Sequence, residues 1–388
     1  MRPVGFILSL GVLTMLCGSC EQQQVVPPPL PIRTAAACAF DASTVVVELS
    51  DQSDPAGYGE CAWRSGQCLG QPAKAANPTI PADRMRFIQG KIQDAFDNAP
   101  AHLQTELCTL RQIYIDPKAN SQNWGLRDVR TPDNSTYIGV ADAMFDAAAP
   151  QPYSLFETLT VRNLLTVPPP PPPVVNLPPQ SNTWLQTVSH SANPADTLTV
   201  KVMAILAHEM GHVIWWAENI PGVTCPPTNG NFQDISWQVH NTPRGFHKYG
   251  RGHSNQNKVE TFTETDMVDD LWRGRVNALI LKMKKIYSQS NWVNLFSFVD
   301  PDEDFIETYR FWALTHAQGG LALTSLNVQF ADADGSQVTR PIVTNGSFGG
   351  TNTDLLTKRQ WIEEWIKGPS PAGRCSFPAP WVAKGGYR

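Results

Sequence analysis

Charged residues are scarce in this chain: only 17% of its 388 residues are Asp, Glu, Lys or Arg, and the formal net charge is -5. Nothing in this composition forces a basic face on the protein, so we predict no nucleic-acid partner. The sequence also lacks a glycine-rich loop that could hold a phosphate and the turn that presents a serine nucleophile. Hydrophobic residues still make up 41% of the chain, which is enough for a folded core.

Long hydrophobic runs are missing as well. The most apolar stretch near the start, residues 4–16, follows Arg2 and is too short to span a bilayer comfortably. It ends in small residues before Cys20, which resembles a bacterial lipoprotein signal. We therefore predict that residues 1–19 are a signal peptide and that the protein is exported. It is then either a periplasmic or cell-surface lipoprotein with a lipid anchor to the membrane at Cys20, or a secreted protein.

Cysteine usage agrees with export. Cys17 leaves with the signal and Cys20 would carry the lipid, so six cysteines remain for the folded protein. An even number in an oxidising compartment predicts up to three disulfides, whose pairing the sequence does not determine. The six are Cys38, Cys61, Cys68, Cys108, Cys225 and Cys375.

The rest of the chain divides by composition. Residues 20–35 are proline-rich and predict a tether, and residues 36–76 form a small cysteine-rich segment. Residues 77–320 carry the periodic patterns of the main domain, and residues 321–388 add a hairpin and a helix that complete it.

Hydrophobic periodicity predicts the elements of the main domain. The most apolar of them, the helix at 197–219, is hydrophobic over much of its circumference and should be buried. The order of elements indicates an α+β fold, with a small mixed sheet packed on this buried helix and a helical C-terminal part. Helices are expected at 83–98, 197–219, 268–287, 303–316 and 354–366, strands at 110–115 and 137–145, and a hairpin turn at 334–335.

The buried helix carries three polar residues in an otherwise apolar run. His208 and His212 lie four positions apart, so both imidazoles project from one face and can bind one ion. Glu209 follows the first histidine, where its carboxylate can take a proton from a water molecule on zinc. Because buried polar groups without partners are costly, a bound Zn²⁺ is the simplest explanation of this HExxH motif.

A third ligand is needed to hold a catalytic zinc ion. Gly and His, which metzincins carry at positions 215 and 218, are replaced here by Trp215 and Glu218, which excludes that pattern. Glu303 and Glu307 are four positions apart at the start of an apolar helix. One of them could bind the metal while the other supports a histidine ligand.

A rival third ligand lies nearer to the motif. Glu260 and Glu264 have the same spacing, although acidic residues there also fit the exposed start of a helix. The aromatic character of the helix after Glu303 favours Glu303 over Glu260. Three further histidines, at positions 240, 247 and 253, could line the same cleft or be exposed loop residues.

With these motifs the chain resembles the gluzincin group of zincin metallopeptidases, over residues 204–216 and 299–314. The resemblance implies a zincin-like fold for residues 77–320 and an edge strand, within 137–141, that binds extended substrate. It also implies His208, His212 and Glu303 as zinc ligands, Glu209 as the catalytic base and Glu307 as a supporting carboxylate. Ile306 departs from the pattern, because such segments usually carry a small residue there.

The sequence therefore predicts an exported zinc peptidase that hydrolyses peptide bonds of a protein or peptide substrate, with Glu209 as general base. A surface binding or scaffold lipoprotein, in which zinc only stabilises a zincin-like fold, is the alternative. A processing enzyme restricted to one partner is a third reading, because long loops could narrow the cleft.

Overall fold

The computed structural model of the chain describes residues 39–50, 72–118, 123–127, 135–146, 185–190, 197–218, 220–226, 228, 230–238, 249–250, 293–294, 297, 301–323, 325–331, 337–344, 347–348, 353–368 and 375. The predicted signal peptide, Cys20 and the predicted helix at 268–287 lie outside these residues. None of the helices that the structure describes combines the length and the apolar composition that a bilayer crossing requires.

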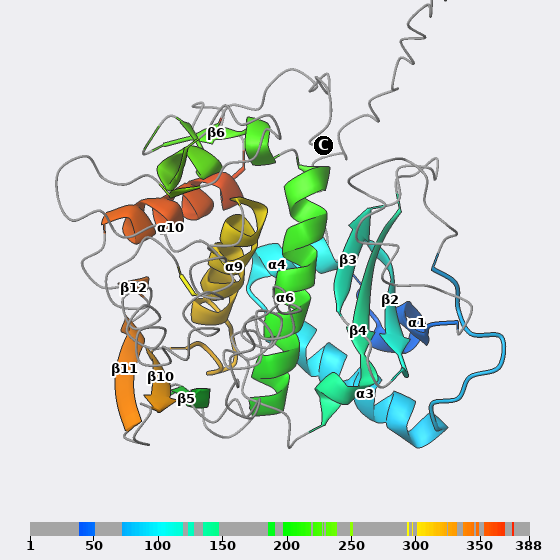
Figure 1. Cartoon of the computed structure of the whole chain (residues 1–388). Helices are drawn as coiled ribbons and strands as arrows, with labels where there is room; N and C mark the ends of the chain where they lie inside the picture. The colour runs from blue at the N-terminus through cyan, green and yellow to red at the C-terminus, as the bar shows by residue number, and fades with distance from the viewer. Residues whose placement is uncertain are drawn as a thin grey trace, which may run out of the picture.

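One long helix, α6 (Thr197–Ala217), runs through the middle of the described part, with a sheet on one side and helix α9 on the other (Figure 1). Its side chains are buried round the helix, as the apolar sequence predicted. The chain then enters a short 3-10 helix, η2 (Ile220–Gly222), which contains Pro221. The predicted buried helix is confirmed, and it ends two residues earlier than expected.

A mixed four-stranded sheet packs along α6, in the order β1-β2-β4-β3. β1, β2 and β4 are parallel, and β3 runs antiparallel to β4. The mixture of helices with a small mixed sheet is compatible with the α+β class. The strands are β1 (Val46–Glu48), β2 (Leu110–Asp116), β3 (Trp124–Arg127) and β4 (Thr136–Ala141). The cysteine-rich segment 36–76 thus supplies the first strand of this sheet.

Two expectations about β4 are wrong. The predicted strand 137–145 stops at Ala141, and Asp142–Phe145 form a 3-10 helix, η1. The stretch 137–141 is also not an edge, because β4 pairs with β2 on one side and with β3 on the other. In the described part of the sheet the strand beyond β4 is β3, at the end opposite to β1. It is a short strand with Gly125 at its second position, which hydrophobic alternation did not reveal.

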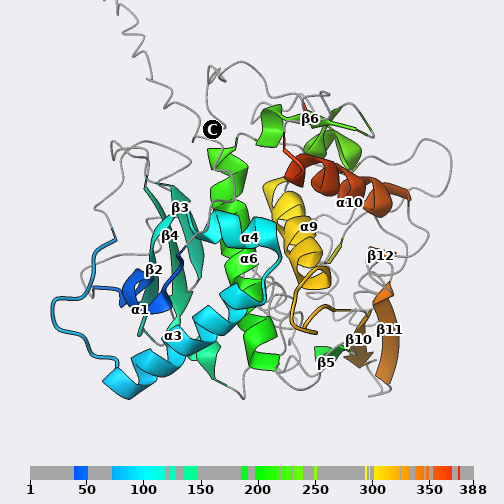
Figure 2. The ribbon, with the colours of Figure 1, turned by 180° about the vertical axis from the view of Figure 1, so that it is seen from behind.

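Two helices cover the back of the molecule (Figure 2). α3 (Ala82–Asp97) buries Ile88, Ile92 and Phe96, the apolar positions that predicted it. α4 (Ala101–Leu107) follows it after a short link that begins at Asn98, and helix α1 (Ala42–Val45) precedes β1.

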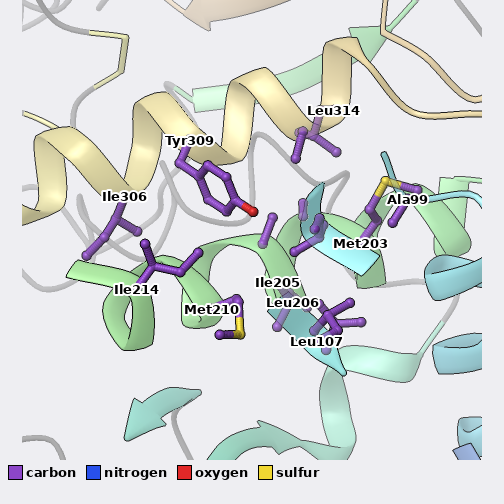
Figure 3. Packing of buried hydrophobic residues seen from close by; sticks show 14 of the residues in the cluster. Ala99, Leu107, Met203, Ile205, Leu206, Met210, Ile214, Ile306, Tyr309 and Leu314 are labelled. Atoms are coloured by element: carbon purple, nitrogen blue, oxygen red, sulfur yellow. The ribbon is translucent and has the colours of Figure 1, made fainter. Parts of the chain in front are cut away.

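On the other side of α6 lies α9 (Pro301–Thr315), which confirms the helix predicted at 303–316. Pro301 at its first position and three acidic residues in its first turn favour a helix start there. In Figure 3, Ile306, Tyr309 and Leu314 of α9 lie over the apolar side chains of α6, among them Ile214. Their burial joins the two helices into one hydrophobic core.

The C-terminal part adds a second sheet and a helix. The sheet has the antiparallel order β12-β11-β10-β5, and its β10–β11 pair is the predicted hairpin, whose turn lies outside the described residues. Its strands are β5 (Leu185–His190), β10 (Ser325–Ala331), β11 (Gln337–Thr344) and β12 (Ser347–Phe348). Helix α10 (Thr353–Ile366) confirms the last predicted helix and packs against α9 (Figure 1).

The stretch that follows α6 is tied to the C-terminal part. It forms η3 (Phe232–Ile235), the pair β6 (Thr224–Cys225) with β7 (Gly230–Asn231), and the pair β8 (Trp237–Gln238) with β9 (Tyr249–Gly250). Cys225 forms a disulfide with Cys375, 150 residues further along the chain, and Trp361 donates its indole hydrogen to the Gly230 carbonyl. This disulfide is one of those that the cysteine count allowed, and Cys108 is also disulfide-bonded.

His102 on α4 gives the fold a pH dependence. Burial lowers the pKa of His102 from 6.5 to about 4, and Nδ1 lies 3.0 Å from the Tyr309 hydroxyl. The unfolded chain binds a proton at His102 at higher pH than the folded chain does. The contribution of neutral His102 to the free energy of unfolding is therefore fully present above pH 6.5 and is lost as the pH falls toward 4. The loss should amount to about 3 kcal/mol.

We expect the His102→Gln variant, which keeps a hydrogen-bonding group, to lack this part of the pH dependence. Urea unfolding of both proteins at a series of pH values measures the difference, in which the other titrating groups cancel. An equal loss of stability between pH 6.5 and 4 in both proteins would contradict the assignment.

Candidate metal centre

Three side chains from two helices converge between α6 and α9. His208 and His212 come from one face of α6, and Glu303 comes from the first turn of α9. Glu303 Oε1 lies 3.5 Å from His212 Nε2, and Glu303 Oε2 lies 3.9 Å from His208 Nε2. Within the described residues these are the three side chains grouped closely enough to hold a metal ion, with ligand atoms within 4.8 Å of one another.

The three side chains could hold a metal ion such as zinc, which prefers tetrahedral coordination. In such a site the donors lie about 3 to 3.5 Å apart, and the two Glu303 oxygens lie 3.5 Å from His212 Nε2 and 3.9 Å from His208 Nε2. Two imidazoles and a carboxylate are ligands that zinc accepts, although the same set also binds other divalent transition metals. These residues therefore form a candidate site for a divalent metal ion, and their positions alone do not determine which metal binds.

Glu307 orients the first histidine. His208 Nδ1 lies 2.6 Å from Glu307 Oε1, and both side chains are buried. An ionised carboxylate can only accept a hydrogen bond, so the hydrogen of the His208 ring lies on Nδ1. The lone pair of Nε2 is then available to bind a metal. The four-residue spacing from Glu303 brings both carboxylates to α6, as the sequence analysis proposed for this pair.

Two further residues hold Glu307. Asn294 and Arg310 both donate to Glu307 Oε2, and both are completely buried. Asn294 is itself fixed by a hydrogen-bonded turn with Ser297. Burial acts to raise the pKa of Glu307, but the Arg310 charge and the hydrogen bonds to the carboxylate outweigh it, and the net shift of the pKa is downward. Glu307 is therefore held as a carboxylate.

The other titratable groups are also tuned by burial. Burial lowers the pKa of His208, and burial together with the neighbouring His208 lowers the pKa of His212 well below its usual value. Both imidazoles are then neutral, the form that binds a metal. Burial and the charge of Glu307 raise the pKa of Glu209 well above its usual value.

Gly211, inside the motif, lets α9 approach α6. A Cβ atom at this position would lie 3.1 Å from Ile306 Cγ2 and 3.2 Å from Ile306 Cα. The large side chain at 306 thus faces a residue without a side chain. This contact sets the spacing of the two helices that carry the ligands.

Strand β3 touches the same turn of α6 from the opposite side. A Cβ atom at Gly125 would lie 2.0 Å from the Glu209 carbonyl oxygen and 3.2 Å from His212 Cβ. Any other residue at 125 would have to move the strand or the helix. The edge strand is therefore held directly beside the histidines of the motif.

Comparisons of this chain with family models, curated proteins and solved structures gave no match. The chemistry of the centre is accordingly inferred from its residues and their geometry.

Several residues considered in the sequence analysis lie outside the part of the chain that the structure describes. Glu260, the rival third ligand, lies outside the described residues, and so do the histidines at 240, 247 and 253. Asn294 and Arg310 were missed by the sequence analysis. Arg310 carried a signal, since it is a charge three positions after Glu307 in an aromatic run, whereas nothing in the sequence around Asn294 marked it.

Replacing Arg310 by Met should destabilise the protein strongly. The change leaves the Glu307 carboxylate buried without its cation, which costs about 3 to 5 kcal/mol. The Arg310→Met/Glu307→Gln variant removes both charges and should lose much less. Denaturant unfolding measures the difference, with Arg359→Met as the control, because its pair with Glu363 is partly exposed and should contribute under about 1 kcal/mol. Equal losses in the Arg310 and Arg359 variants would contradict the role given to the buried pair.

Proposed function

We propose that this protein is a zinc peptidase with a zincin-like fold, in which His208, His212 and Glu303 hold Zn²⁺. The observation that carries the proposal is the convergence of these three side chains, with His208 oriented by Glu307. Structural zinc sites are usually closed by four protein ligands, whereas catalytic sites have three and leave one position for water. A closed structural site would have no use for Glu209 beside His208, so this residue favours catalysis over a purely structural role.

Each residue has a role in hydrolysis. Zinc held by His208, His212 and Glu303 would lower the pKa of a water molecule toward neutrality and would polarise a substrate carbonyl. The buried Glu209 carboxylate then accepts the proton of the attacking water and later delivers it to the leaving amine. Glu307 keeps the His208 ring in one tautomer and orientation throughout.

For substrate binding we propose β3, in place of β4, as the strand that pairs with an extended peptide. It ends the described part of the sheet, and Gly125 sits against the Glu209 backbone. A peptide added to a sheet edge is held by main-chain hydrogen bonds, so its scissile bond would lie beside the metal ligands. This arrangement fits protein or peptide substrates.

We further propose that the protein acts outside the cytoplasm, as a lipoprotein anchored at Cys20 or as a secreted enzyme. The Cys225–Cys375 disulfide supports this location, because such bonds form and persist in oxidising compartments.

The test is a mass-spectrometric survey of peptides released from a denatured protein mixture. The zinc-loaded protein should generate new cleavages that a chelator abolishes and added zinc restores, and the Glu209→Ala variant should generate none. Identical empty profiles from both proteins, with zinc bound in each, would rule out general peptide hydrolysis. That result would favour a zinc-stabilised binding protein or an enzyme for one partner.

A further inference from the structure

Asp304 follows the proposed ligand Glu303 directly, and its carboxylate is held from outside α9. Lys358 Nζ lies 2.8 Å from Asp304 Oδ1 and 2.7 Å from Oδ2. Trp237 donates its indole hydrogen to Oδ2 at 3.1 Å. The side chains of Asp304 and Lys358 are both 0% exposed, so this is a fully buried ion pair.

The contacts of Asp304 join three separate parts of the chain. Lys358 belongs to α10, and Trp237 belongs to β8 in the stretch after α6. The stretch after α6 is also tied to the C-terminal part of the chain by the Cys225–Cys375 disulfide. Asp304 therefore attaches the first turn of α9 to a cross-linked frame.

A buried ion pair is poor evidence for added stability, because removing two charges from water costs about as much as their attraction returns. It is directional, however, and can fix one arrangement of the elements it joins. Asp304 applies this constraint in the first turn of α9. Glu303 lies in that turn.

The geometry of a helix transmits this anchor to the ligand. Successive residues of an α-helix point about 100° apart, so fixing the direction of one side chain fixes that of the next. Asp304 is held toward α10 and β8, while Glu303 reaches the histidines of α6. A small rotation of the first turn would move the Glu303 carboxylate away from His208 and His212.

We propose that Asp304, Lys358 and Trp237 are positioning residues for Glu303, and that helix α10 is thereby part of the metal centre. The proposal rests on the proposed function only in requiring that the centre binds zinc. It predicts that weakening the anchor changes metal affinity and ligand geometry in a chain that still folds.

Trp237→Phe tests the anchor with a matched control, Trp361→Phe. Each change removes one indole donor from a buried tryptophan, but only Trp237 donates to Asp304. Zinc affinity is measured by competition with a chromophoric chelator, ligand geometry by the absorption spectrum of bound Co²⁺, and folding by thermal unfolding of the metal-free chain. We expect Trp237→Phe to bind zinc about tenfold more weakly with an altered Co²⁺ spectrum, and Trp361→Phe to lose stability without either effect.

A second variant, Asp304→Asn/Lys358→Met, removes both charges without leaving one alone. It should fold and bind zinc about 10- to 100-fold more weakly than the wild type. Unchanged zinc affinity and Co²⁺ spectrum in either folded variant would overturn the proposal, as would an equal loss of affinity in Trp361→Phe. A wild type that binds zinc but releases no peptides would refute the peptidase and leave this comparison valid, whereas one that binds no zinc would overturn both.

Discussion

The Glu209→Ala variant should lose peptide hydrolysis almost completely while keeping its zinc. Glu209 is buried on the metal-binding turn and has a raised pKa, caused by burial and by the charge of Glu307, but it is not one of the three clustered donors. A general base contributes about 10²- to 10⁴-fold to a rate, so kcat/KM should fall by about a thousandfold. Zinc content and unfolding temperature should stay close to those of the wild type.

Glu209→Gln is the matched variant, because it keeps the size and the hydrogen-bonding capacity of the side chain and removes only the base. We expect it to be as inactive as Glu209→Ala. Rates are measured on a peptide identified in the survey, with zinc content determined by atomic absorption. Substantial activity in either zinc-loaded variant would refute the role of Glu209.

The Glu303→Ala variant should bind zinc far more weakly. Replacing a group that only supports a ligand typically costs 10- to 100-fold in metal affinity, so loss of the ligand itself should cost at least about 100-fold. Hydrolysis should be lost at zinc concentrations that saturate the wild type. Chelator competition gives the affinities of the two proteins directly.

Glu260→Ala is the control for this prediction, since Glu260 has the same sequence spacing to a second glutamate, Glu264. It should retain wild-type zinc affinity, because Glu303 already lies 3.5 Å from His212 Nε2 and 3.9 Å from His208 Nε2. The opposite outcome, with affinity lost in Glu260→Ala and kept in Glu303→Ala, would move the third ligand to Glu260.

Much of the framework could be predicted because it depends on local patterns. The apolar run of α6, the proline and acidic residues that begin α9, and the spacing of the two histidines each act within one element. The four-residue spacing of Glu303 and Glu307 and the aromatic helix that follows them favoured this pair over Glu260 as partners of the motif.

What could not be predicted depends on contacts between distant segments. The edge position of β3 follows from pairing with β4, and a four-residue strand containing Gly125 has too little alternation to reveal it. The support of Glu307 by Asn294 and the support of Asp304 by Lys358 join residues from different elements. Such contacts leave no periodic signal in a single sequence.

The attachment of α9 to α10 has a consequence for the timing of activity. A chain that is made and exported from its amino end carries His208, Glu209 and His212 long before it carries Lys358 and Cys375. Until the later residues arrive, the first turn of α9 has neither its ion pair nor the frame closed by the Cys225–Cys375 bond. For the exported zinc peptidase proposed above, we therefore expect the chain to hold zinc poorly until residues 358 and 375 have been translocated and the disulfide has formed.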